Sequence, residues 1–152
     1  MHKTGKNNFK LDQRAIERLD LALITIRAWA KESLVEVVLF GSYAKGREHE
    51  YSSIDLLIVI KSSAQRFIER KIELERLLNE DNEMPMIDTL VYTEEEILEL
   101  INKMESFVIS VIDEGILLWN GFNDIDLKSL SNESLIPSRY KGTLPKLEKI
   151  YD

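Results

Sequence analysis

The hydrophobic positions of this chain first follow a helical period and then form two nearly continuous apolar runs. From Leu11 to Ser33, apolar side chains recur three or four positions apart, which predicts an amphipathic helix that covers one face of a sheet. Residues 35–40 are rich in β-branched and aromatic side chains, and residues 54–60 are apolar at every position except Asp55. Runs of this kind are typical of strands that are buried on both faces.

The second half of the chain predicts further helices and strands. Capping boxes, in which a hydroxyl residue stands three positions before an amide or carboxylate residue, indicate helix starts near Ser62 and Thr93. The predicted elements are a helix over 63–79, a strand over 86–92, a helix over 94–102, a helix over 105–114 with Gly115 as its C-cap, and a short edge strand over 116–119.

These elements predict an α/β (α+β) fold, a small mixed β-sheet with helices packed mainly on one face. A chain of 152 residues is long enough for one such domain. We assign residues 1–10 to a flexible N-terminal segment, 11–121 to the domain and 122–152 to a C-terminal extension rich in Asn, Ser, Asp and Lys. The extension either packs on its own domain or forms an arm that contacts a partner.

Composition narrows the classes of function. Acidic residues outnumber basic ones by 27 to 20, which argues against nucleic acid as a partner because phosphate backbones are bound by clustered positive charge. The chain has no cysteine, so disulfides and thiolate metal sites are excluded. Its polar N-terminus lacks an apolar segment, and we therefore expect a cytoplasmic protein without a membrane anchor.

The residues after the first apolar run have the chemistry of a phosphate-binding turn. Gly41 follows that run directly, and a glycine lets the backbone approach an anion closely. The Ser42 hydroxyl and the Lys45 ammonium can add donors, and residues 43–45 can turn as a helix whose first amides point toward the anion. An ordinary strand-to-helix turn would have the same sequence, so the turn alone defines no function.

Asp55 is an ionisable residue inside an apolar strand. A buried carboxylate needs a cation, hydrogen-bond donors or a place at the exposed start of the strand. Residue 53 lies on the same strand face, where a second carboxylate could help to hold a divalent metal, but the chain has Ser53 there. Asp88, on a later strand, is either a third carboxylate of the site or a water-exposed aspartate. The loop at residues 48–50 is either solvated or supplies a replacement ligand.

These residues fall into two linked motifs, Gly41-Ser42-Tyr43-Ala44-Lys45-Gly46 and Ser52-Ser53-Ile54-Asp55-Leu56-Leu57. Together they resemble the signature of the minimal nucleotidyltransferases of the DNA polymerase β-like superfamily, Gly-Ser-x-Ala-x-Gly followed by Ser-Asp-x-Asp-Leu. The spacing between the two halves also fits. The resemblance covers roughly residues 11–121, and it departs from the pattern at Ser53, where the family carries its first metal-binding aspartate.

The resemblance implies a Mg²⁺-dependent enzyme that transfers AMP from ATP to a hydroxyl. Gly41, Ser42 and Lys45 would bind the nucleotide, and Asp55 and Asp88 would be the catalytic, metal-binding acids. The family's first metal-binding aspartate would stand at position 53. Because Ser53 occupies that position, one ligand and one unit of negative charge are missing, and the two-metal site is expected to be impaired.

Small members of this family resemble antitoxins paired with HEPN-type toxins, which suggests a partner protein as the AMP acceptor. The alternative is a catalytically inactive module that binds a nucleotide, a partner toxin or both. Exposed strand edges can pair with a second chain, so a homodimer is a further hypothesis.

Overall fold

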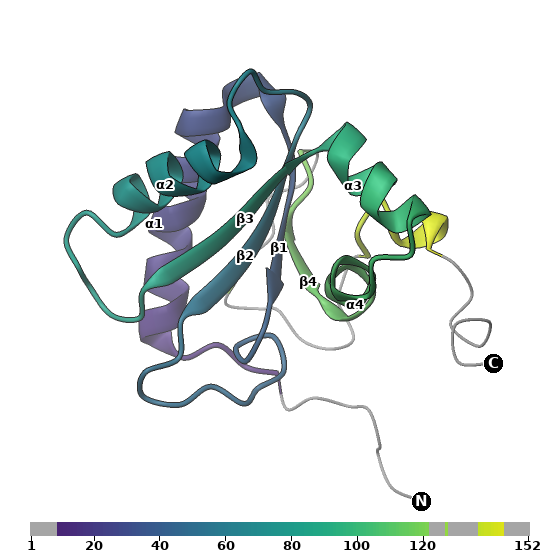
Figure 1. The fold of residues 1–152 in the computed structure, drawn as a ribbon. Helices are drawn as coiled ribbons and strands as arrows, with labels where there is room; N and C mark the ends of the chain where they lie inside the picture. The colour runs from purple at the N-terminus through teal and green to yellow at the C-terminus, as the bar shows by residue number, and fades with distance from the viewer. Residues whose placement is uncertain (1–8, 122–126, 128–136, 145–152) are drawn as a thin grey trace, which may run out of the picture.

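The computed structural model describes residues 9–121, 127 and 137–144, and these form a four-stranded sheet between two layers of helices (Figure 1). The elements in chain order are α1 (Gln13–Ala30), η1 (Lys31–Ser33), β1 (Leu34–Phe40), β2 (Ile54–Ile60), α2 (Phe67–Leu78), β3 (Ile87–Thr93), α3 (Glu94–Asn102), α4 (Ser106–Glu114), β4 (Ile116–Trp119) and η3 (Lys141–Thr143).

The sheet is mixed, with strand order β3-β2-β1-β4. The central strand β1 is antiparallel to both β2 and β4, whereas β2 and β3 are parallel. The two continuous apolar runs of the sequence therefore occupy the centre, where both strand faces are covered. Every residue of β2 is buried except Asp55, which is half-buried.

Alternating side chains of the central strands feed two separate cores. One core lies under α1 and α2 and receives Ile54, Leu56 and Ile58 of β2. The other lies under α3 and α4 and receives Leu57 and Val59. Figure 1 shows the corresponding layers, with α1 and α2 on one side of the strands and α3 and α4 on the other.

The predicted mixed α+β fold is confirmed. The two long helices share one face, as expected, and the short helices α3 and α4 cover the opposite face, because the second set of buried strand residues also needs apolar cover. All four strands form within a residue of their expected limits, including β4 at the sheet edge. No helix among the described residues is long and apolar enough to cross a membrane.

The start of α2 differs from the prediction. The helix begins at Phe67, with Arg66 as its N-cap, and the carboxylate of Glu69 accepts the Arg66 N–H at 2.7 Å. The Ser63 hydroxyl instead accepts the Gln65 N–H at 3.0 Å and closes a local turn. The second capping box is correct: Thr93 and Glu96 exchange hydrogen bonds at the start of α3.

The described part of the C-terminal extension contacts the domain through a buried carboxylate. Glu36 on β1 is 1% exposed and accepts hydrogen bonds from the Ser138 hydroxyl and from the Arg139 N–H. Burial is the main influence on this group and raises the pKa of Glu36. The rest of the extension, apart from Leu127 in the first core, and the N-terminal segment before Phe9 lie outside the described residues.

Side chains of α2 bind the outer edge of β3. The Asn79 amide bonds both backbone groups of Ile87 at 2.9 Å. One turn earlier, the Glu75 carboxylate accepts the N–H of Thr89 at 2.6 Å, and a further turn back the Lys71 ammonium donates to the C=O of the same residue at 2.8 Å. Val91 is the next residue whose backbone groups face the sheet edge, and the Arg70 guanidinium donates to its carbonyl at 2.8 Å. The helix therefore satisfies backbone groups that an edge strand would otherwise expose.

Arg70 is the most buried cation of this contact, and we predict that it dominates the stability of the α2–β3 packing. Its guanidinium is 3% exposed and pairs with both oxygens of Glu96. We expect Arg70→Met to lower the free energy of unfolding in urea by about 3 kcal/mol, because it breaks a buried pair and leaves the Val91 carbonyl unsatisfied. The matched control is Arg66→Met on the same helix, where the exposed pair with Glu69 is worth less than about 1 kcal/mol. Equal losses in the two variants would contradict the prediction.

Candidate functional site

Gly41 directly follows β1 and has a backbone conformation that only glycine adopts easily. Its φ is +77°, and a Cβ at this position would lie 2.2 Å from Oδ2 of Asp55. The turn that follows is closed by hydrogen bonds from the Lys45 N–H to the Gly41 carbonyl and from the Arg47 N–H to the Ser42 carbonyl, at 3.2 and 2.9 Å. Residues 42–46 form a hydrogen-bonded turn, which includes one helix-like bond from Lys45 to Gly41, and do not continue into a helix.

Asp55 lies at the start of β2, where the strand is paired on both sides. Its Cα is in register with Phe40 of β1 and with Asp88 of β3. The Ser53 hydroxyl donates to Oδ1 of Asp55 at 2.7 Å, so residue 53 does lie beside this carboxylate, as the alternation predicts. Burial is the largest influence and raises the pKa of Asp55, and the neighbouring charge of Asp88 acts in the same direction.

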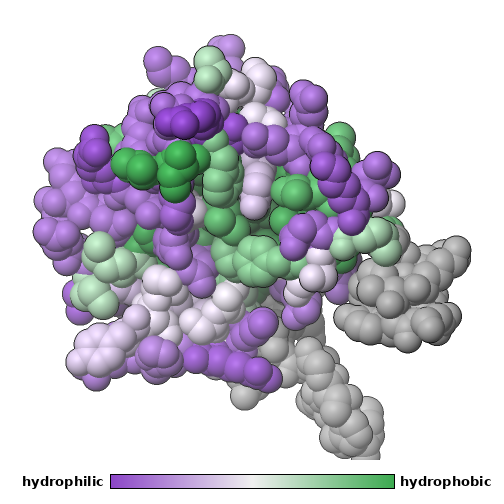
Figure 2. Space-filling view, in the orientation of Figure 1, coloured by the Kyte–Doolittle hydropathy of each residue, from purple (hydrophilic) through white to green (hydrophobic). Residues whose placement is uncertain are grey.

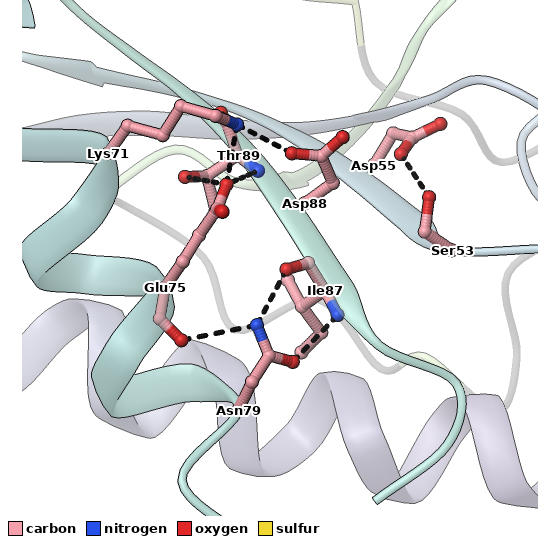
Figure 3. A network of polar contacts seen from close by, with 8 residues as sticks. All are labelled: Ser53, Asp55, Lys71, Glu75, Asn79, Ile87, Asp88 and Thr89. Atoms are coloured by element: carbon pink, nitrogen blue, oxygen red, sulfur yellow. Dashed lines mark hydrogen bonds and ion pairs between the residues drawn. The ribbon is translucent and has the colours of Figure 1, made fainter. Parts of the chain in front are cut away.

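Asp88 lies next to Asp55 but is already engaged by a cation from α2. The Lys71 ammonium lies 2.6 Å from Oδ1 of Asp88 and 2.6 Å from Oε2 of Glu75 (Figure 3). Burial is the largest single influence and opposes the charge on Asp88, but the hydrogen bonds with Lys71, Glu75 and the Thr89 backbone and the charge of Lys71 together outweigh it, and the pKa of Asp88 is lowered. The structure thus brings the two predicted acids together and adds a positive charge beside one of them.

A cavity of about 300 Å³ opens beside Asp55, between the Gly41 turn and α4. Lys45 lines it on the turn, and Phe107 and Ser110 line it on the helix. Phe107 packs edge-on against Phe40, with ring centroids 5.9 Å apart, and forms an apolar wall. In the space-filling view, apolar residues gather in the middle of this face, and a further apolar patch lies over α2 among polar side chains (Figure 2). A glycine turn, the carboxylates of Asp55 and Glu114, the Lys45 cation and an aromatic wall therefore share one pocket.

The loop at residues 48–50 does not supply the missing ligand in this arrangement. Glu48, His49 and Glu50 line a different hollow together with Tyr43 and Asp12, and none of the three lines the cavity at Asp55. A larger hollow of about 690 Å³ between α1 and Trp119 is also remote from the carboxylates, and there Arg27 lies 5.6 Å above the Trp119 ring.

The acids present fit one divalent ion better than two. Among the residues that the structure describes, no group of three His, Cys, Asp or Glu side chains is placed to hold a metal. Mg²⁺ is commonly held by one or two carboxylates together with substrate phosphates, a role that Asp55 can fill. Two ions at one site need shared carboxylates, and here Ser53 is neutral while Asp88 is paired with Lys71.

Sequence reasoning missed Lys71 and Glu75. Their spacing of four residues on a predicted helix is visible in the sequence and is typical of a surface ion pair. What the sequence does not show is that this pair faces β3 and reaches Asp88, because that depends on how α2 packs along the sheet edge.

Comparison with known proteins establishes the family. Residues 23–118, more than half of the chain, match the family model of the nucleotidyltransferase domain. The chain therefore belongs to the nucleotidyltransferase domain family. Over 39 residues it is 46% identical to the "Putative protein adenylyltransferase MJ1305" of Methanocaldococcus jannaschii, and this match spans 26% of each chain.

The chain also has a weak similarity to two solved structures, with TM-scores just under 0.5. One is a "putative nucleotidyltransferase from Sulfolobus solfataricus", with a TM-score of 0.49 and 21% identity over 75% of this chain and 87% of that one. The other is a "toxin-antitoxin with AMP-PNP", with a TM-score of 0.48 and 18% identity over 68% and 74% of the two chains.

We predict that Gly41→Ala disrupts the site and destabilises the fold. An alanine at φ +77° costs about 1–2 kcal/mol in backbone strain, and its Cβ would also displace the Asp55 carboxylate. Urea unfolding should show a loss of at least that size. Gly142→Ala is the matched control, because nothing lies within 4 Å of a Cβ there, and we expect a change within about 0.5 kcal/mol. A Gly41→Ala variant as stable as this control would refute the close approach of Gly41 and Asp55.

Proposed function

We propose that this protein binds a nucleoside triphosphate, with ATP as the first candidate, in the cavity between the Gly41 turn and α4. A single Mg²⁺ accompanies the phosphates and is held by Asp55. In this proposal the chain does not carry out efficient two-metal transfer. The observation that carries it is the contrast between two neighbouring carboxylates: Asp55 faces the cavity beside Gly41, whereas Asp88 is bound to Lys71.

The lining of the cavity suits the parts of a nucleotide. Gly41 and Lys45 line the cavity, so phosphate oxygens would meet the backbone of the turn and an ammonium, and the Ser42 hydroxyl belongs to the same turn. Phe107 offers an apolar surface for the base or ribose. When bound, the metal would neutralise phosphate charge beside the ionised Asp55.

The second candidate is transfer of AMP from ATP to a hydroxyl of a partner protein. It is favoured by the register of Asp55 with Asp88, which places two acids side by side. The 46% identity over 39 residues with the "Putative protein adenylyltransferase MJ1305" also supports it. Under this proposal the partner is a HEPN-type toxin, and the protein acts as a cytoplasmic antitoxin. A homodimer is compatible with either candidate.

Calorimetry with ATP and Mg²⁺ tests the first candidate. We expect the wild-type chain to bind Mg²⁺-ATP and Asp55→Asn to weaken that binding by about tenfold, the loss for one charged contact of ~1.5 kcal/mol. Asp81→Asn, in the exposed turn after α2, is the control for net charge and should leave the affinity unchanged. Absence of binding by the wild type, or equal affinity of the wild-type and Asp55→Asn chains, would contradict the proposal.

Radiolabel transfer separates the two candidates. The chain is incubated with α-³²P-labelled ATP, Mg²⁺ and a purified HEPN-type toxin as the candidate acceptor, and the label on protein is counted. We expect no more label than in an Asp55→Asn reaction, because two ions are not held together when Ser53 is neutral and Asp88 is paired. Label above that background would favour AMP transfer over binding alone.

A further inference from the structure

The Lys71 ammonium has a complete set of hydrogen-bond acceptors. It donates to Oδ1 of Asp88 and Oε2 of Glu75 at 2.6 Å each and to the carbonyl of Thr89 at 2.8 Å. An ammonium group has three N–H donors, so all three are used. These acceptors come from one turn of α2 and from two consecutive residues of β3. The arrangement is a cation site made by the fold and filled by one of its own side chains.

The acceptors around Lys71 are themselves held in place. The oxygen of Glu75 that meets the ammonium also accepts the backbone N–H and the hydroxyl of Thr89, at 2.6 and 3.0 Å. Pairing with β2 fixes the backbone of Thr89, and Thr89 is only 1% exposed.

This cation lies beside the position that a second metal ion would need. Asp88 is in register with Asp55 on the adjacent strand, and Figure 3 shows Lys71 and Asp55 on opposite sides of Asp88. A divalent ion shared by the two aspartates would have to compete for the Asp88 carboxylate with an ammonium that is already bound there. It would also be repelled by that positive charge.

We propose that the Lys71 ammonium is a built-in substitute for a metal ion at Asp88, so that Ser53 and Lys71 together keep a second metal out of the site. The inference rests on the proposed function for its relevance to nucleotide binding. Because Lys71 holds Asp88 independently of residue 53, restoring an acid at position 53 is not sufficient to restore the metal site. Removal of the ammonium is the second requirement.

The experiment is a double-mutant cycle read out by Mn²⁺ binding without nucleotide. Mn²⁺ is titrated into the wild-type, Ser53→Asp, Lys71→Met and Ser53→Asp/Lys71→Met chains, and free Mn²⁺ is followed by electron paramagnetic resonance. We expect the double variant to bind Mn²⁺ at least tenfold more tightly than either single variant. Lys103→Met combined with Ser53→Asp is the charge control, because Lys103 forms an exposed pair with Glu99 on α3, and it should match Ser53→Asp alone.

Two results would overturn the inference. One is equal Mn²⁺ affinity of Ser53→Asp and of the double variant, which would mean that Lys71 moves aside without cost. The other is no gain in affinity in any variant. Thermal unfolding shows whether each variant is folded. If Lys71→Met is unfolded, Lys71→Gln takes its place, because the Gln amide is a hydrogen-bond donor without charge. The titration contains no nucleotide, so failure of ATP binding in calorimetry would count against the proposed function and not against this inference.

Discussion

The antiparallel pairing of β1 with β2 is the constraint on which the candidate site depends. This pairing sets Phe40 opposite Asp55, so the residue after Phe40 must pass within contact distance of the Asp55 carboxylate. A side chain at that point would occupy the space of the carboxylate, and Gly41 has none. The strand pairing, the turn and the half-buried acid are therefore one structural unit, and the apolar remainder of both strands keeps that unit in register.

Electrostatics divides the two acids of the site into different roles. Asp55 receives a hydrogen bond from the neutral Ser53 and faces an open cavity, so it has capacity for an external cation. Asp88 receives an internal cation, and its charge is balanced within the fold. The two aspartates on adjacent strands thus differ in their capacity to bind a metal ion, because Asp55 lies beside a hydroxyl and Asp88 beside an ammonium. A neutral residue at position 53 and an ammonium at position 71 act in the same direction, toward fewer bound metal ions.

Much of this arrangement could be predicted from the sequence, and the exceptions have physical causes. Continuous apolar runs identify β1 and β2 because central strands exclude water on both faces, and the period of two correctly places Ser53 beside Asp55. The start of α2 is misplaced because the Ser63 hydroxyl binds a neighbouring amide. The contact of Lys71 with Asp88 joins residues 17 positions apart and depends on helix packing, which local patterns do not encode.

The contact between α2 and the free edge of β3 also limits how the protein can assemble. Four residues of an α-helix rise about 6 Å, close to the roughly 6.6 Å between alternate residues of a strand, so side chains one turn apart can follow the outward-facing backbone groups in step. Asn79 and Glu75 do this at Ile87 and Thr89, and Arg70 continues the series at Val91, in the manner of an added strand made of side chains. That edge is closed to sheet extension, so a second chain that joined this sheet by strand addition would have to do so at β4.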